Sequence, residues 1–519
     1  MMRDRLRLAE LVAMLSLAGD VGMGQPMEHA MRQCLIALRL ANRFDLDDDD
    51  RARLYYVSLL AWVGCHIDAY EQAKWFGDDL ALKGDFRLVD MTGLGPLSFM
   101  LSHLGAGSSP LHRLGVAARF VAGGQRDAKD MLANHWYAAD ALAAQLGLDE
   151  QARETLSQTF ERWDGKGEPN GIAGDQILLT AAIVNLADVL EVFHRVAGTQ
   201  GAIAVARERS GTQFAPEVVD VAIAEAATLF AELDGVTTWA AVIDAEPGLA
   251  RCLDDTELDT ALQAIADFID VKSPYTLGHS RAVADLAANA AEHLRFSADD
   301  ITHVGRAALL HDLGRLGVPN TIWDKPGALT PGEIERVRLH PYLTHRMLAG
   351  SPTLAALGAT AVQHHERLDG SGYPRALRSD ALTPCGRVLA AADAYRSKLE
   401  PRPHRPAVAP QQAADWLRAE VRAGRLDAAA VDGVLVAAGH PARRRKPHAG
   451  GLTAREVEVL QMLARGMTNS QTAAALGISG KTVSRHVENI YAKIGVSNRA
   501  RASLFAVRNG LLDDAPRMG

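Results

Sequence analysis

Cysteine is scarce in this chain. The 519 residues include four cysteines, none of which lies at a short spacing from another: Cys34, Cys65, Cys252 and Cys385. A disulfide framework or a zinc ribbon requires closely paired cysteines, so the sequence argues against both. Few and scattered cysteines are typical of a reducing compartment, and we expect a cytoplasmic protein.

Long apolar runs and aromatic residues are also rare. No stretch approaches the roughly 18 apolar residues that cross a bilayer, and residues 1–5 lead into an amphipathic segment, unlike the apolar core of a signal peptide. We therefore expect no membrane partner. Aromatic residues make up 5% of the chain, alanine and leucine are abundant, and no alternating strand pattern is convincing. These features predict a nearly all-α protein.

The charge and length limit the domain organisation. A net charge of −8 at pH 7 argues against a chain that coats nucleic acid along its whole length, although it allows a local basic patch. At roughly 100–200 residues per domain, a chain of this length should form two to four domains.

Histidines and carboxylates gather in the second half of the chain. Seven of them lie in helix-forming sequence: His279, His311, Asp312, His340, His364, His365 and Asp393. Two metal ions a few Å apart can polarise a phosphodiester and activate water, and they need mixed ligands of this kind. Asp312 is the natural bridge between the ions, and ligands without thiolate favour Fe, Mn or Zn over copper. The sequence thus predicts a site for two divalent metal ions.

Local sequence supports this site. The run Thr330-Pro331-Gly332-Glu333 has the features of a helix start, and we expect that helix to carry His340. If His364 and His365 lie on a helix, they point about 100° apart and suit one ligand per metal. The loop that contains Gly372, Tyr373 and Pro374 is rich in turn residues and can bring the backbone close to a ligand.

These motifs resemble a known family. Residues 262–440 resemble the HD-GYP family, a branch of the HD phosphohydrolases, in segments 275–281, 310–319, 325–327, 364–374 and 392–395. The resemblance implies an all-α metal-dependent phosphodiesterase that acts on cyclic di-GMP, with all seven residues as metal ligands. It also implies that Arg402 and Arg405 contact the dinucleotide phosphates, and we place the Gly372-Tyr373-Pro374 loop at the substrate.

Two positions depart from the family pattern. Arg315 stands where the family usually has lysine; with Asp312 it is our candidate catalytic residue. Arginine keeps the charge but lacks the compact ammonium group, so turnover falls if that group stabilises the transition state. Some members carry a further carboxylate four residues before the first histidine. Tyr275 occupies that position, so we expect two metals and not three.

The sequence contains an internal repeat. When the sequence is aligned with itself at a shift of 250 positions, His29 matches His279 and residues 59–64 match 309–314. Farther along the chain the shift is 205, and there His135 matches His340 and Asp188 matches Asp393. The change of shift indicates an insertion in the first copy between residues 70 and 129. Four ligand positions are replaced in the first copy, by Ala61, Trp62, Thr159 and Phe160. We interpret it as a fold that has lost the metal chemistry and serves sensing, dimerisation or packing.

The C-terminal end reads as a separate DNA-binding domain. Thr453 and Glu456 form a capping box, and Val483, Val487, Ile490 and Ile494 form one apolar stripe of a later helix. The opposite face of that helix presents Lys481, Thr482, Arg485 and His486, which suits a recognition helix in the major groove of double-stranded DNA.

This end also resembles a known family. Residues 452–512 are similar to the LuxR-type helix-turn-helix through segments 452–456, 466–469, 476–479, 481–483 and 493–496. The resemblance implies four helices, dimeric binding to DNA, and Lys481, Thr482 and Arg485 facing the DNA. Gly480, early in the recognition helix, is a small departure that weakens that end.

We therefore predict two tandem HD-type helical domains followed by a four-helix LuxR-type domain. The boundaries are 1–240 for the degenerate first domain, 250–440 for the HD-GYP domain, 441–451 for a basic linker and 452–513 for the DNA-binding domain. The function expected is a homodimeric transcriptional regulator whose HD-GYP domain hydrolyses cyclic di-GMP with two Fe or Mn ions. Two alternatives stay open: a ligand-gated regulator that binds a nucleotide with little or no turnover, and a phosphohydrolase for another nucleotide.

Overall fold

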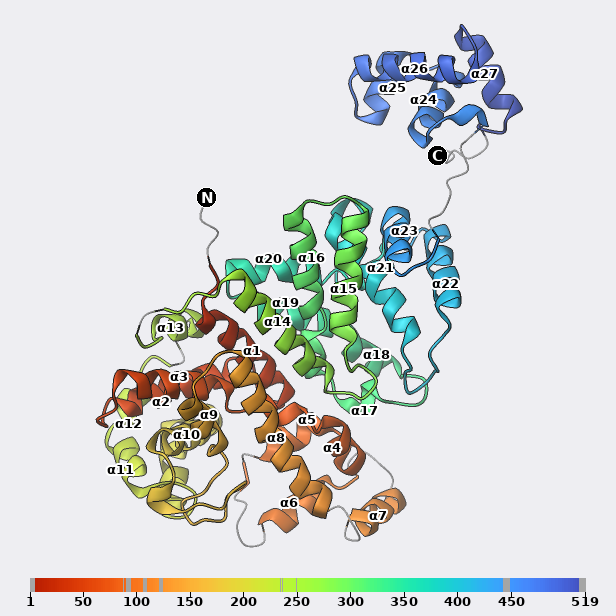
Figure 1. The fold of residues 1–519 in the computed structure, drawn as a ribbon. Coiled ribbons are helices and arrows are strands. Elements are labelled where there is room, and N and C mark those ends of the chain that lie inside the picture. Colours follow the sequence, from red (N-terminus) through yellow and green to blue (C-terminus); the bar gives the residue numbers. More distant parts are fainter. Residues whose placement is uncertain are drawn as a thin grey trace. The chain divides into compact units, whose positions relative to one another are not determined.

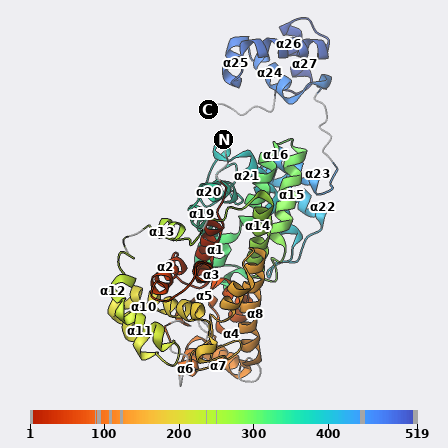
Figure 2. The ribbon, with the colours of Figure 1, turned by 60° about the vertical axis from the view of Figure 1, so that its left-hand side comes forward.

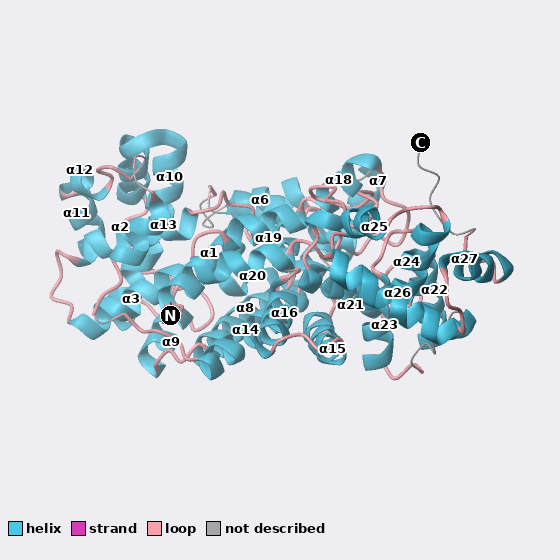
Figure 3. Ribbon diagram, turned by 90° about the horizontal axis from the view of Figure 1, so that it is seen from above, coloured by secondary structure: helices cyan, strands magenta, loops and turns pink. Residues whose placement is uncertain are grey.

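Helices form almost the whole of the described chain. The computed structural model describes residues 5–512 except 87, 90–94, 106–109, 121–124, 234, 236, 249 and 442–448. Within these ranges there is no strand, only isolated bridges such as Arg402 with Arg405 (Figure 3). The all-α prediction is confirmed. In the described residues, no helix combines the length and apolar character needed to cross a membrane.

The chain divides into two compact units, Met1–Pro441 and Ala442–Gly519 (Figure 1). The first unit contains both predicted helical domains, and a single hydrophobic core extends through them. Most of the predicted basic linker lies outside the described residues, since 442–448 are not among them.

The first unit begins with a half whose principal elements are α1 (Leu8–Gly22), α2 (His29–Ala41), α3 (Asp48–Leu60), η1 (Val63–His66), α8 (Gln125–Gln145), α9 (Glu150–Ser157) and α10 (Leu179–Glu208). The shorter α11 (Pro216–Ala224), α12 (Ala226–Leu229) and α13 (Thr238–Asp244) follow. Helix α1 is buried on nearly every side, because it packs on α2 and α3 and also on η4 and α19 of the next half (Figure 2). This central helix joins the two halves.

The second half repeats the order of the first. It comprises α14 (Asp255–Asp270), α15 (His279–His293), α16 (Ala298–Leu310), η4 (Leu313–Gly317), α17 (Asn320–Trp323), α18 (Pro331–Arg338), α19 (His340–Leu348), α20 (Pro352–Ala361), α21 (Pro384–Leu399), α22 (Pro410–Arg422) and α23 (Ala428–Ala437). Three helices and a 3-10 turn open each half, and a left-handed residue, Glu28 or Gly278, precedes the second helix. As a result, His29 and His279 each begin a helix.

Four extra helices lie where the sequence predicts an insertion: α4 (Ala69–Phe76), α5 (Asp79–Phe86), α6 (Gly95–His103) and α7 (Pro110–Arg119). They have a small core of their own, which includes Trp75, Phe99 and Phe120. One residue of α5 reaches the second half: buried Asp79 lies 3.4 Å from the Nζ atoms of both Lys83 and Lys272.

The second unit consists of α24 (Ala454–Ala464), α25 (Asn469–Leu476), α26 (Gly480–Ile494) and α27 (Arg499–Arg508). Thr453, Thr468, Ser479 and Asn498 each cap one of these helices through a side-chain oxygen. Such caps satisfy backbone N–H groups that the first turn of a helix leaves unpaired. Val483 and Ile490 are fully buried, which confirms the centre of the predicted apolar stripe of α26.

Candidate metal centre

Five helices bring the seven predicted ligands together, most of them at a helix end. His279 begins α15, His311 and Asp312 follow α16, and His340 begins α19. His364 and His365 follow α20, and Asp393 lies within α21.

Two local expectations were wrong. Thr330 caps its helix as predicted, but α18 ends at Arg338 and His340 begins the next helix. The pair His364 and His365 lies in the turn after α20, so the helical spacing of 100° does not apply to it. The two rings nevertheless stay close, with centroids 4.1 Å apart.

Asp312 lies between two groups of ligands. Its Oδ1 is 3.5 Å from His340 Nε2 and 3.7 Å from His364 Nε2. Its Oδ2 is 3.5 Å from His311 Nε2 and 3.9 Å from His279 Nε2. One carboxylate therefore faces a different pair of imidazoles with each oxygen, which is the arrangement of a bridging ligand.

Asp393 and His365 complete the two groups. Asp393 Oδ1 lies 3.4 Å from His279 Nε2, and its Oδ2 lies 3.9 Å from His365 Nδ1. The side chains of one group, His340, His364 and His365, place their ring nitrogens within 4.8 Å of one another. His279, His311 and Asp312 form a second such group.

Backbone carbonyls orient three of the imidazoles. The Nδ1–H groups of His311, His340 and His364 donate to carbonyl oxygens three residues earlier, at 2.6, 2.6 and 2.7 Å. Each bond leaves Nε2 as the nitrogen that faces Asp312, and the Nε2 atoms of His340 and His364 lie 3.0 Å apart. Ligand histidines are commonly oriented by a hydrogen bond on the other ring nitrogen.

Burial keeps three of the clustered imidazoles, His340, His364 and His365, in the neutral form. Burial lowers the pKa of His340 to about 4 and that of His364 to about 3. The pKa of His365 is likewise lowered, first by burial and then by His364. Neutral imidazole is the form that binds a metal ion, so these three ligands need no deprotonation at neutral pH.

His279 differs from the other histidines. Burial alone would lower its pKa, but hydrogen bonds with Asp393 and Glu400 outweigh it and raise the pKa to about 10. Its Nδ1 lies 2.8 Å from a Glu400 oxygen. A metal ion at Nε2 would displace the proton there, while Glu400 would continue to accept from Nδ1.

The residues present fit a pair of divalent ions. The donors are imidazole and carboxylate, with no thiolate, which suits hard to borderline metals such as Fe and Mn. His311 Nε2 is buried and has no hydrogen-bond partner in the part of the chain that the structure describes. An orphaned buried nitrogen carries a cost that a metal ion would remove.

Arg315 is held rigidly beside the site. One of its terminal nitrogens lies 2.9 Å from Asp312 Oδ2, and its guanidinium carbon lies 4.2 Å from the centroid of the Trp323 ring. A stacked and ion-paired guanidinium has little freedom to follow a reacting group.

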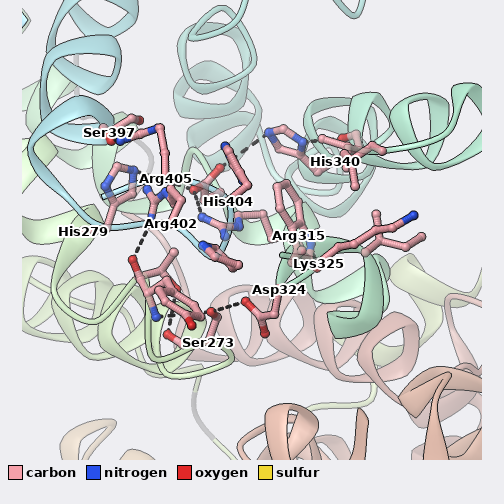
Figure 4. Close-up of a pocket in the computed structure, with 18 of the residues that line it drawn as sticks. Ser273, His279, Arg315, Asp324, Lys325, His340, Ser397, Arg402, His404 and Arg405 are labelled. Carbon is pink, nitrogen blue, oxygen red and sulfur yellow. Dashed lines mark hydrogen bonds and ion pairs between the residues drawn. The ribbon is translucent and has the colours of Figure 1, made fainter. Parts of the chain in front are cut away.

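A cavity of about 280 Å³ opens beside the ligands (Figure 4). Arg315, Arg402 and Arg405 line it together with His279 and His340. Arg402 is paired with Glu400 at 2.9 Å and also donates to the Tyr275 carbonyl. The two predicted phosphate-contacting arginines thus lie on the wall of the metal cavity.

The Gly372-Tyr373-Pro374 loop has a different location. Its three residues are not among the described residues that line this cavity. The Tyr373 ring lies against His365, with centroids 4.7 Å apart. A Cβ on Gly372 would lie 2.4 Å from the Arg367 nitrogen, so the close approach of the two backbone segments requires glycine. The loop therefore packs against His365, one of the predicted ligands, and does not line the cavity.

Sequence reasoning missed Glu400 and Trp323. Glu400 follows Asp393 by seven residues, which is two helical turns, so a carboxylate on the same face of α21 could have been sought. Nothing in the local sequence of Trp323 indicates the stacking with Arg315.

Some of the residues that the sequence alignment matches to the predicted ligands also lie together in the first half. His29 Nε2 lies 2.9 Å from Asp188 Oδ1, as the aligned His279 lies beside Asp393. His135 Nε2 pairs with Asp68 Oδ2 at 2.8 Å, and the Trp62 and Phe160 rings meet edge to face at 5.1 Å.

In the second unit, the predicted DNA-facing residues lie on α26. Lys481, Thr482 and Arg485 are exposed, and His486 is half-buried. Lys493, on the same helix, is paired with Glu456 at 2.7 Å.

Comparisons with known proteins agree with this organisation. The HD domain family matches residues 263–430, and the luxR family of bacterial regulatory proteins matches residues 451–506. The 3′3′-cGAMP-specific phosphodiesterase 3 of Vibrio cholerae is 31% identical over 405 residues, which cover 77% of this chain and 88% of that protein. A cyclic di-GMP phosphodiesterase of Thermotoga maritima is 35% identical over 156 residues, which cover 29% of this chain and 42% of that protein.

A solved structure has a similar fold. The crystal structure of a cyclic GMP-AMP specific phosphodiesterase of Vibrio cholerae gives a TM-score of 0.59 at 26% identity and covers 84% of this chain and 98% of that one. Such coverage extends well beyond residues 263–430, so the similarity includes helices of the first half.

Proposed function

Because the chain belongs to the HD-GYP family and carries a LuxR-type domain, we propose that it is a DNA-binding regulator whose residues 250–440 hydrolyse a cyclic dinucleotide. The observation that carries this proposal is the position of Asp312, whose two oxygens face two separate sets of histidines. Two divalent ions, when bound, would neutralise phosphate charge and lower the pKa of an attacking water.

The protein's own groups would bind and orient the substrate. The cavity beside the ligands is lined by Arg402 and Arg405, which offer guanidinium groups to a diester phosphate. Arg315 would add positive charge next to Asp312. Tyr373 would hold the His365 ring in place, because the two rings are packed together.

The names of two relatives suggest two candidate substrates. The Vibrio cholerae protein that covers most of this chain is named for 3′3′-cGAMP, and the Thermotoga maritima protein is named for cyclic di-GMP. We take 3′3′-cGAMP as the first substrate to test, since that relative shares more of the chain. Cyclic di-GMP, which the sequence motifs imply, is the second.

The test is hydrolysis by the full chain, loaded anaerobically with Fe(II) or Mn(II). Each dinucleotide is supplied separately and linear product is measured by chromatography. We expect metal-dependent turnover that disappears in Asp312→Ala. Metal binding without product from either dinucleotide would contradict an enzymatic role.

A second candidate is a nucleotide receptor with little turnover. Arg315 favours it, because its guanidinium is fixed between Asp312 and Trp323 where the family usually has lysine. Arg315→Lys discriminates between the two functions. A large gain in turnover would support the receptor, whereas unchanged or reduced turnover would support the enzyme.

We also propose DNA binding by α26, with Lys481, Thr482, Arg485 and His486 as the contacting residues and a homodimer in the cytoplasm as the acting species. Exposure of the first three supports this assignment. Arg485→Ala should weaken binding to a cognate operator by about 1–3 kcal/mol if the side chain reads a base. If the substitution weakens binding equally for all DNA sequences, Arg485 contacts the phosphates and not a base.

The first half is, in our proposal, a degenerate HD-like domain. The same order of elements and the retained pair His29–Asp188 support it. Its proposed role is regulatory, through α1 and the buried contacts that reach the second half.

A further inference from the structure

The first half contains a mainly apolar cavity of about 320 Å³. Trp62, Thr159 and Phe160 line it, and all three stand at positions that align with metal ligands of the second half. His135 and Asp188, aligned with two further ligands, line it as well. The cavity therefore occupies the place that corresponds to the metal centre.

The replacements change the chemistry of that place. The Trp62 N–H donates to Gln33 Oε1 at 2.9 Å, so the polar edge of the indole is satisfied away from any ligand. Phe160 packs edge to face against the same ring. What the two side chains offer to the cavity is apolar surface, which favours the binding of apolar molecules.

Helices of the insertion supply the other wall. Phe76, Leu82, Phe86, Phe99 and Met100, from α4, α5 and α6, line the cavity. They have no counterpart in the second half, where the shorter segment between η4 and α19 holds α17 and α18. The insertion thus encloses the altered site with large apolar side chains.

Most of the charged side chains that line the cavity pair with residues outside its lining, while Glu161 accepts from the Asn170 N–H and Arg209 donates to Gln213. Lys83 pairs with Asp79, Arg162 with Asp164, His135 with Asp68, and Asp188 with His29. A charged ligand would have to replace one of these partners after losing its own hydration. The site is therefore better suited to an uncharged molecule.

We propose that this cavity binds a small, uncharged and mainly apolar molecule. With about 30 Å³ for an atom the size of a water molecule, the volume admits on the order of ten non-hydrogen atoms. The site is separate from the metal cavity, and its occupancy does not depend on the phosphodiesterase activity proposed above.

The test is calorimetric titration of the full chain with 1-octanol, which has the appropriate size. Octanoate, its charged counterpart of equal chain length, is titrated in parallel. We expect one saturable site for 1-octanol and at least tenfold weaker binding of octanoate. No saturable binding of 1-octanol would overturn the proposal, and tighter binding of octanoate would overturn the assignment of an uncharged ligand.

Two variants that fill the cavity locate the site. Val189→Phe and Met100→Trp change residues on opposite walls, one on α10 and one on α6. Each should weaken 1-octanol binding at least tenfold. Val196→Phe is the matched control, because Val196 is also on α10 but is 61% exposed.

Circular dichroism and thermal melting of each variant establish that it is folded before it is titrated. If one cavity variant does not fold, the other carries the test. Binding that survives in a folded cavity variant, or that is lost equally in Val196→Phe, would place the alcohol elsewhere and overturn the proposal.

Discussion

His135 and His340 occupy aligned positions in the two halves, yet their protonation is opposite. Burial alone would lower the pKa of both. In His135, Cys65 and Asp68 outweigh burial and raise the pKa to about 9. In His340, burial prevails and the pKa falls to about 4. Cys65 and Asp68 therefore favour the cationic form of His135, whereas His340, buried among other histidines, stays neutral and can bind metal.

The largest effect should come from the aspartates at the two sites. Asp312→Asn should lower metal content and reduce hydrolysis by more than the roughly 100-fold that loss of an outer partner can cost. Asp188→Asn, the change in the first half, should leave metal content unchanged and lower the free energy of unfolding by about 1–3 kcal/mol. Elemental analysis and urea unfolding measure both quantities. An equal loss of metal from the two variants would contradict the difference in metal binding between the two halves.

An intermediate effect is expected at the glutamates behind the first histidines. Glu400 accepts from His279 Nδ1, and Glu191 lies 2.5 Å from His29 Nδ1. Glu400→Gln should weaken metal binding about 10–100-fold, because it removes the negative charge of the partner that orients His279. Glu191→Gln should leave metal affinity as it is. Competition with a chelator gives both affinities, and a matching loss in Glu191→Gln would show that the first half also holds metal.

The smallest effect is the dependence of stability on pH. The raised pKa of His135 contributes stability that is fully present below about pH 6.5 and is lost as the pH rises through about 9. The lowered pKa of His340 gives the opposite pH dependence of stability in the metal-free chain. Its contribution is present above about pH 6.5 and is lost as the pH falls toward 4.

Urea unfolding of His135→Gln and of the unaltered chain at pH 6 and pH 10 tests the first sign. The difference in the free energy of unfolding should shrink at the higher pH, by an amount on the order of 1–3 kcal/mol. A difference that grows with pH would mean that His135 is buried as the neutral form.

Sequence patterns predicted which side chains gather at the candidate metal centre, because most of them lie in short motifs near helix ends. His311 and Asp312 are adjacent in the chain, and a helix start fixes the position of His279. Arg402 was placed on the cavity by resemblance, but its contact with the Tyr275 carbonyl joins residues 127 apart in the sequence. Contacts of that range depend on how helices pack, and no local period encodes them.

The apolar cavity of the first half could not be predicted from the sequence either. The replacements at Trp62 and Phe160 could be found by aligning the repeat, and they were interpreted as loss of chemistry. The sequence does not show that the helices of the insertion form the other wall of the cavity beside these two side chains. Loss of one ligand set and gain of another binding surface look identical in a sequence.

Asp79 links the two halves of the first unit. Besides its two lysines, it accepts a hydrogen bond from the Asn320 N–H at 2.8 Å, and the Asn320 side chain in turn holds Asp324 on the wall of the metal cavity. Lys272 and Asn320 are both buried, so a chain without the first half would leave them without Asp79 as a partner. The two halves are therefore expected to unfold as one cooperative unit and not as two independent modules.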